Sequence, residues 1–363
     1  MPTSETGVFS SLLEQAAQFA EGLPHPDLLA VFGLAAMAIL SVLIAIWLIG
    51  KVLSGSRRLH QYASMRAMRD DGNAGTKVMV ASVGGVGGMS VRKAVLDSLE
   101  RHLPMFNFGS PFYLGSCPID VEATDFALSK TDHETLLQTF EKSGADLIIW
   151  GEARGRAKGN MLCFSTPDMV NGESAKGFVA VNLMGNPSDW GEDERRAIAY
   201  VAGRRLRPSL GKPADFRADR LLPIIQSMET LLTETTILTG KARTELDDDF
   251  AAGALHIGEQ LKDPKWLEKA AEYRTRALAA MKPGDDQLRW SQAKIDLGRA
   301  MILQCEHKFE PLVLQEAMNH LREGIEATKS DRRMKLADTG LEAFNHAETM
   351  LANRRRFSIR WNT

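Results

Sequence analysis

The sequence predicts a multi-domain protein with an N-terminal transmembrane helix, a small α/β sandwich domain and a C-terminal all-α domain of helical repeats. Three observations predict this organisation: an uncharged apolar run over residues 28–50, alternating strand and helix patterns over residues 76–206, and a helical pattern over residues 221–352 that repeats after 47 residues. The other parts are a short amphipathic outer segment, a juxtamembrane linker and a basic and aromatic tail, at residues 1–27, 51–75 and 353–363.

The apolar run at residues 28–50 is the predicted membrane anchor. It holds 23 residues without a charged side chain, and crossing a bilayer takes roughly 20. A cleavable signal peptide would begin with basic residues and have a shorter apolar stretch, whereas residues 1–27 contain four acidic residues and no Lys or Arg. We therefore expect a retained single-pass helix in contact with the lipid bilayer; a buried core helix is the alternative.

Charges beside the run predict its orientation. Basic residues follow it closely, at Lys51, Arg57, Arg58, Arg66 and Arg69. Because cytoplasmic flanks carry the excess of Lys and Arg, we expect the N-terminus outside a bacterial inner membrane and the C-terminal body in the cytoplasm. Three cysteines without paired spacing fit a reducing compartment; they are Cys117, Cys163 and Cys305. The reversed topology, with a periplasmic body in a cell-envelope complex, stays open.

Two further features concern the membrane-proximal part. Apolar residues recur at helical spacing between Phe9 and Leu23, which predicts an amphipathic helix on the outer membrane face; a disordered tail is the alternative. Ser41 and Ala45 form a small-xxx-small pair that would let a second helix approach, so a homo-oligomer is compatible with the sequence.

Charge and length constrain the soluble part. The chain has 44 basic and 46 acidic residues, which argues against binding of nucleic acid through net charge. The length behind the anchor suffices for two domains. Pro208, Gly211 and Pro213 mark a boundary between them, within residues 207–220.

The first soluble domain begins with a buried strand at residues 77–82, and Ser90 is the expected cap of the helix that follows. Thr131 and Glu134 match a capping box and predict a second helix that ends at Gly144. Further elements are a strand over residues 146–152, antiparallel strands over residues 161–166 and 178–184, and a helix over residues 192–206. The predicted order is β-α-(β)-α-β-β-β-α.

The stretch SGADLIIWGE at residues 143–152, with this element order, resembles the TolB amino-terminal-like domain. In that family a strand of this pattern follows the second helix and leads into an antiparallel hairpin. The resemblance covers about a third of the chain, and the first strand lacks the Pro-Phe ending that is usual in the family. It implies a non-catalytic interaction module.

A glycine-rich loop between the first strand and helix is the candidate anion site. Its candidate residues are Gly84, Gly85, Gly87, Gly88 and Ser90. The loop is similar to the phosphate loop of deviant Walker ATPases, which implies nucleotide binding. However, Gly88 stands where that loop has its phosphate-contacting lysine, and Met89 stands where it has the hydroxyl for Mg²⁺. A tight β-α turn that needs glycine for positive φ is the alternative.

No complete catalytic motif occurs elsewhere. There is no H-E-x-x-H pair and no G-x-S-x-G elbow. Cys305 and His307 lack further ligands at zinc spacing. The sequence therefore predicts no enzyme, no metal and no cofactor.

The second soluble domain repeats itself. Leu267 and Ala270 recur 47 residues later as Leu314 and Ala317, and Phe250 recurs as Leu297. Each unit therefore predicts a helix, a loop and a second helix. Helices at residues 221–239 and 333–352 would cap the stack.

The second unit resembles the tetratricopeptide repeat, in which a Trp precedes Leu-Gly and a small residue. The matching residues are Trp290, Leu297, Gly298, Ala300, Ala317 and Gly324. The first unit departs from the pattern, because it has Phe250-Ala251 in place of Leu-Gly and no Trp at position 243. The resemblance implies a groove for a protein partner; an ordinary helical bundle is the alternative.

These features together predict a membrane-anchored scaffold or assembly protein that presents protein-interaction domains in the cytoplasm, without catalysis and without nucleic acid. The alternative is a nucleotide- or anion-sensing membrane protein that uses the loop at residues 84–88. The tail at residues 353–363 mixes Arg with Phe357 and Trp361; it is open to a peripheral membrane contact or to a partner.

Overall fold

The computed structural model describes residues 39–45, 47, 62–70, 75–121, 123–124, 127–155, 158–172, 177–234, 237–282, 284–329 and 334–360. The chain divides into two compact units, Met1–Ala63 and Ser64–Thr363. The predicted outer segment and most of the predicted span lie outside the described residues. Residues 39–45 and 47 are helical and exposed. In the part of the chain that the structure describes, no helix combines the length and the apolar character that crossing a membrane takes.

The α/β domain is built on a mixed sheet of five strands in the order β2-β1-β5-β6-β7. The strands β2, β1 and β5 run parallel, and β5, β6 and β7 run antiparallel. Their bounds are Lys77–Gly84 for β1, Tyr113–Ser116 for β2, Leu147–Ala153 for β5, Asn160–Ser165 for β6 and Val179–Leu183 for β7. A separate antiparallel pair joins β3 (Ala123–Thr124) to β4 (Ala127–Leu128). The predicted antiparallel hairpin is confirmed.

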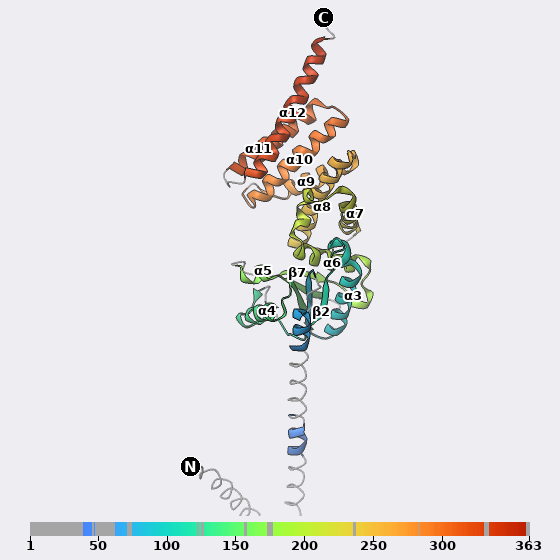
Figure 1. Ribbon diagram of the computed structural model, residues 1–363, viewed down its shortest axis with the longest axis vertical. Coiled ribbons are helices and arrows are strands. Elements are labelled where there is room, and N and C mark those ends of the chain that lie inside the picture. The colour runs from blue at the N-terminus through green and yellow to red at the C-terminus, as the bar shows by residue number, and fades with distance from the viewer. Residues whose placement is uncertain are drawn as a thin grey trace, which may run out of the picture. The chain divides into compact units, whose positions relative to one another are not determined.

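Helices cover both faces of this sheet, as Figure 1 shows. Side chains alternate between the faces along each strand: Val78 and Ile149 belong to one buried cluster, and Met79 and Trp150 belong to the other. The first face packs on α3 (Gly88–Phe106) and α6 (Glu192–Leu206). The second packs on α4 (Lys130–Ser143), with α5 (Pro167–Asn171) beside it. The sandwich predicted for residues 76–206 is thus present.

Two predicted helix starts are wrong. Helix α3 begins at Gly88 with Gly87 at its N-cap, and no side chain caps it; Ser90 already lies inside the first turn. Gly87 has φ of 91°, so a left-handed residue turns the chain into the helix where we expected a hydroxyl cap. Helix α4 begins before Thr131, because Ser129 Oγ accepts from the Asp132 N–H at 3.1 Å. Its predicted end at Gly144, with φ of 63°, is confirmed.

Part of the predicted linker at residues 51–75 belongs to the α/β domain. Residues 62–70 are helical. Met65 and Met68 on this helix are buried in the same cluster as Met79 and Trp150. Met65 and Met68 carry the apolar signal here, because residues three apart lie on one face of a helix.

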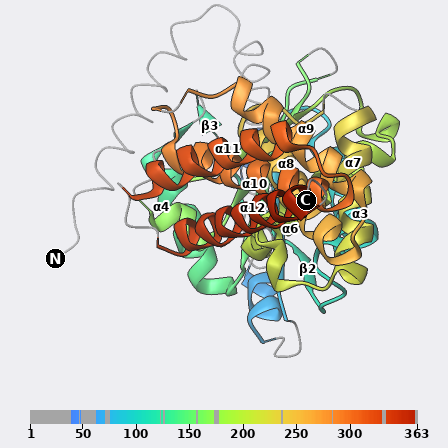
Figure 2. The same ribbon diagram turned by 90° about the horizontal axis from the view of Figure 1, so that it is seen from above.

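The all-α region follows two 3₁₀ turns, η2 (Pro208–Gly211) and η3 (Pro213–Asp215). Six helices are described in it: α7 (Ala218–Glu234), α8 (Gly240–Leu261), α9 (Pro264–Ala279), α10 (Gln287–His307), α11 (Pro311–Lys329) and α12 (Met334–Arg360). Figures 1 and 2 show α10, α11 and α12 side by side. The first predicted cap ends early, at Glu234. The second extends to Arg360, so residues 353–360 are not a separate tail; no Gly or Pro follows Gly340 to end the helix.

The hairpins α8–α9 and α10–α11 pack through small residues. A Cβ on Gly298 would lie 2.7 Å from Leu321 Cγ and 2.9 Å from the carbonyl oxygen of Ala317. A Cβ on Gly324 would lie 2.8 Å from Ile295 Cγ1. The two helices therefore touch at positions where a larger side chain has no room. This is the close pairing expected for Gly298, Ala317 and Gly324.

Helix α12 corresponds to the first helix of a third unit. Phe344 and Ala347 follow Leu297 and Ala300 by 47 residues, and all four belong to or pack on buried clusters. The opposite face differs. Ile295 and Gly298 of α10 adjoin α11 and Ile302 is buried in the cluster that joins these helices, whereas the counterparts of these three residues in α12 are polar and exposed. These counterparts are Glu342, Asn345 and Thr349. A polar outer face is what a capping helix requires.

The α/β domain and the first hairpin share one hydrophobic core. A single buried cluster contains Val80 of β1, Tyr200 of α6, Leu221 of α7, Phe250 of α8 and Trp266 of α9. A second cluster joins α10, α11 and α12. At the boundary predicted within residues 207–220 the chain therefore changes from mixed α/β to all-α structure. The hydrophobic core continues across this boundary.

Replacement of Gly298 by Val should destabilise the helical region by about 1–3 kcal/mol, because the added side chain overpacks the α10–α11 contact. Gly284→Val is the control, since no atom lies within 4 Å of a Cβ there. Urea unfolding of the full-length protein in detergent, followed by tryptophan fluorescence, measures both. Equal stabilities for the two variants would contradict the packing described.

Candidate functional site

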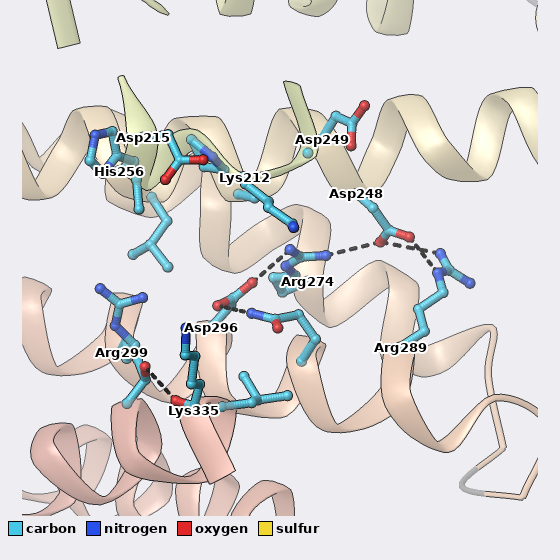
Figure 3. A pocket seen from close by; sticks show the side chains of 18 of the residues that line it. Lys212, Asp215, Asp248, Asp249, His256, Arg274, Arg289, Asp296, Arg299 and Lys335 are labelled. Carbon is cyan, nitrogen blue, oxygen red and sulfur yellow. Dashed lines mark hydrogen bonds and ion pairs between the residues drawn. The ribbon is translucent and has the colours of Figure 1, made fainter. Parts of the chain in front are cut away.

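A cavity with a volume of about 1180 Å³ lies against α8, α10 and α12 (Figure 3). The turns η2 and η3, the end of α6 and Arg274 of α9 form its remaining wall. Equivalent positions of successive helices line it: Asp249 corresponds to Asp296, and Gln292 corresponds to Thr339, each 47 residues later. The cavity therefore follows one face of the helices that begin each unit.

Asp249 of α8 is the first buried charge in the wall, with only 3 % of its surface exposed. The hydroxyl of Tyr200 donates to its Oδ2 at 2.9 Å, and Arg204 Nε lies 2.6 Å from the same oxygen. Both partners come from α6, so the carboxylate ties the α/β domain to the first hairpin. Arg205 pairs with Glu245 one turn earlier in α8.

Burial shifts the pKa values of Asp249 and of its hydrogen-bond donor Tyr200. Burial raises the pKa of the Asp249 carboxyl, and the charge of Arg204 opposes that shift. Burial, assisted by the charge of Asp249, raises the pKa of Tyr200 well above its usual value. The Tyr200 hydroxyl therefore stays protonated and donates a hydrogen bond to the Asp249 carboxylate.

Asp296 of α10 is the corresponding charge in the second unit and is also 3 % exposed. Arg274 of α9 donates to its Oδ2 at 2.6 Å and to Oδ1 of Asp248 at 2.9 Å. Gln292 donates to the other oxygen of Asp296 at 2.8 Å, and Arg289 lies 2.5 Å from Asp248 Oδ2. A buried charge is costly unless it is paired and hydrogen-bonded. Asp296 meets that condition through Arg274 and Gln292, and Arg274 meets it through its two terminal nitrogens, whereas Arg274 Nε has no hydrogen-bond partner among the described residues.

A second set of ion pairs links successive helices at the 47-residue interval. Glu259 of α8 pairs with Arg299 of α10 at 2.9 Å. Glu306 of α10 lies 2.7 Å from Nε2 of His346 in α12. Because both members of the second pair follow the first by 47 residues, the unit repeats in its polar contacts as well as in its core.

Two lysines of the cavity differ from its arginines. Figure 3 shows the amino groups of Lys212 and Lys335 directed toward Arg274 and Asp296 from opposite walls. Among the described residues neither amino group has a carboxylate within 4 Å, whereas Arg204, Arg274, Arg289 and Arg299 all do. Lys212 lies between η2 and η3, and Lys335 lies in the first turn of α12.

The arrangement is suited to binding charged groups. Its arginines pair with Asp and Glu side chains of the wall, Gln292 hydrogen-bonds Asp296, and two lysines lie beside these pairs. Across the described ranges, no three His, Cys, Asp or Glu side chains gather within reach of one metal ion. The Nε2 atom of His256 lies within hydrogen-bond distance of the carbonyl oxygen of Phe216, at 2.8 Å.

The glycine loop is a packed turn at the end of β1. A Cβ on Gly85 would lie 2.2 Å from the carbonyl oxygen of Ala153, and one on Gly88 would lie 1.9 Å from that of Val83. The Gly88 and Ser90 amides donate to carbonyl oxygens inside the loop. Val86 and Met89 are 96 % and 88 % exposed. These contacts favour the structural turn, because two of the amides that an anion would use are already engaged.

The residues of the predicted repeat motif support the helix pair and lie outside the cavity. Trp290, Leu297, Gly298 and Ala300 lie on α10, and Ala317 and Gly324 lie on α11. Trp290 is half-buried, with Lys294 Nζ 5.3 Å from its ring centroid. The predicted set thus identified how the hairpin packs, and it missed the face that lines the cavity.

A signal for that face was present in the sequence. When the two units are aligned with an offset of 47 residues, Asp249 aligns with Asp296 and Glu259 aligns with Glu306. An acidic residue retained at a position next to the apolar core indicates a buried partner or a ligand. The apolar and small residues that the two units share do not reveal this face.

Comparison of the chain with protein-family models, with curated proteins and with solved structures gives no match.

Replacement of Asp249 by Asn should lower the free energy of unfolding by about 3–5 kcal/mol, because it leaves the Arg204 guanidinium without its buried counter-charge. Asp219→Asn is the control. It removes an exposed partner of Arg217 at 3.2 Å and should cost less than about 1 kcal/mol. Urea unfolding of the full-length chain measures both; equal losses would show that the buried pair does not stabilise the junction.

Proposed function

We propose that this protein is a single-pass, membrane-anchored scaffold or assembly protein whose cytoplasmic body binds a protein partner, without catalysis. The observation that carries the proposal is the charged cavity along equivalent faces of α8, α10 and α12. Helical repeats use such faces as extended binding surfaces. The volume of about 1180 Å³ exceeds the 300–1,000 Å³ typical of small-molecule sites.

Two finer assignments support this proposal. We assign the all-α region to a tetratricopeptide-like array on the Trp290 and Leu297-Gly298 pattern, the paired helices and the close contacts at Gly298 and Gly324. We assign the α/β domain to a TolB amino-terminal-like module on its strand at Leu147–Ala153 and the antiparallel hairpin that follows. Both assignments imply interaction modules.

The anchor and its orientation enter the proposal from the uncharged run at residues 28–50 and the basic residues behind it. A helix there would tether the soluble body to a membrane. A partner of the cavity would then be a membrane-associated protein or one recruited to the membrane.

Topology can be tested by labelling a single cysteine. Cys117, Cys163 and Cys305 are buried, and burial raises the pKa of Cys163 to about 12, so the native thiols should not react with maleimide while folded. A Ser188→Cys variant places a thiol on the exposed turn η1 (Pro187–Asp189). We expect a membrane-impermeant maleimide to label it only after cells are permeabilised. Labelling in intact cells would place the body outside the cytoplasm.

Partner binding can be tested by photocrosslinking in native membranes. A photoreactive amino acid at Thr339, inside the cavity, should give a discrete crosslinked product with a second protein. The same amino acid at Lys265, exposed on α9 and outside the cavity, is the control and should not. A product of equal yield from both positions, or from neither, would contradict partner binding through this face.

A further inference from the structure

Within the described part of the chain, some charged side chains of the cavity wall are paired with an opposite charge and others are not. Its four arginines, Arg204, Arg274, Arg289 and Arg299, are each within ion-pair distance of a carboxylate in its wall. Those carboxylates, at Asp248, Asp249, Glu259 and Asp296, are consequently all engaged. The remaining charged side chains of the wall are Lys212, Lys335 and Asp215. The groups still open to a ligand therefore carry a net positive charge.

The two lysines are well placed to act together. They come from segments more than 100 residues apart and approach the same central region from opposite walls (Figure 3). Each has a flexible stem and three N–H donors, which suits single carboxylate oxygens. The Arg274–Asp296 pair between them is fixed by burial, since Arg274 is 3 % exposed, and forms a floor that a ligand would contact without displacing.

Apolar surface lies next to the lysines. Leu288 of α10 is 37 % exposed, and it is the residue that Lys335 follows by 47 positions. Leu336 adjoins Lys335, and Leu255 and Ala252 of α8 also line the cavity. A ligand that fits would present an aliphatic side chain beside its negative charges.

We propose that the cavity binds an acidic peptide segment of a partner protein, with carboxylates paired to Lys212 and Lys335 and an aliphatic side chain on Leu288 and Leu336. The proposal rests on the proposed function and names the chemistry of its partner. A basic segment fits less well, because apart from Asp215 the carboxylates of the wall would first have to release Arg204, Arg274, Arg289 or Arg299. Leaving a buried arginine without its partner is costly.

The experiment selects ligands without assuming their sequence. Random octapeptides displayed on phage are selected on the full-length protein in detergent. We expect enriched peptides that combine two or more Asp or Glu residues with Leu, Ile or Val. Enrichment of neutral or basic peptides, or no enrichment over detergent-loaded beads, would overturn the proposal.

Variants then locate the site. The Lys212→Glu, Lys335→Glu double variant should bind the most enriched peptide at least about 10-fold more weakly by fluorescence anisotropy, since like charges placed together cost several kcal/mol. Lys265→Glu makes the same change of charge per residue on α9 and should change affinity less than about 2-fold. Equal weakening by Lys265→Glu would show general electrostatic attraction and overturn the assignment.

A neutral variant covers the case in which charge reversal disturbs folding. Lys212→Gln with Lys335→Gln removes the two charges, keeps both side chains polar and should still weaken binding about 3-fold or more, with an unchanged melting temperature. Unchanged affinity in this variant would overturn the role of the lysines.

Photocrosslinking from Thr339 in the charge-reversed chain separates the two proposals. If the product forms in the otherwise unchanged protein and survives the double substitution, the acidic-segment proposal fails while the scaffold proposal stands. If no product forms in either protein, the scaffold proposal fails with it.

Discussion

The buried carboxylate of Asp249 is the interaction on which the arrangement of the soluble body depends. It lies where water cannot solvate it, so it needs the Tyr200 hydroxyl and the Arg204 guanidinium, both supplied by α6. Without these two partners the Asp249 carboxylate would be buried and unpaired. The requirement orients α8 against the α/β domain, and it brings the turns η2 and η3 to the edge of the face that α8 shares with α10.

One position in the repeat is therefore satisfied in two ways. Asp296 takes its guanidinium from Arg274 of α9, the second helix of the preceding hairpin. Asp249, its counterpart, has no complete hairpin before it, and α6 of the α/β domain supplies Arg204 instead. The α/β domain thus occupies the place of an earlier unit, and the shared apolar core from Val80 to Trp266 accompanies this substitution.

Periodic apolar patterns predicted most of the fold, because each strand and helix buries one regular face. The strand at Leu147–Ala153, the hairpin after it and the helix pairs follow from such patterns. The residues that begin two helices were not predicted correctly: Gly87, in the left-handed conformation, is the N-cap of α3, and Ser129 is the N-cap of α4. The cavity was not predicted either, because Lys212, Asp249, Arg274, Asp296 and Lys335 come together only through tertiary packing. Comparing charged positions between the units would have revealed Asp249 and Asp296 but not Lys212, which lies outside both units.

The polar outer face of α12 has a consequence for how such a protein can change over generations. Glu342, Asn345 and Thr349 are polar and exposed, so they offer no apolar surface on which a further helix could pack. The corresponding face of α10 packs on α11. A duplicated unit inserted ahead of α12 would keep this solvated end and add one more set of Asp and Arg positions to the charged face. Mutation of the three polar residues to aliphatic ones would instead create an adhesive end, and protein molecules would join through it.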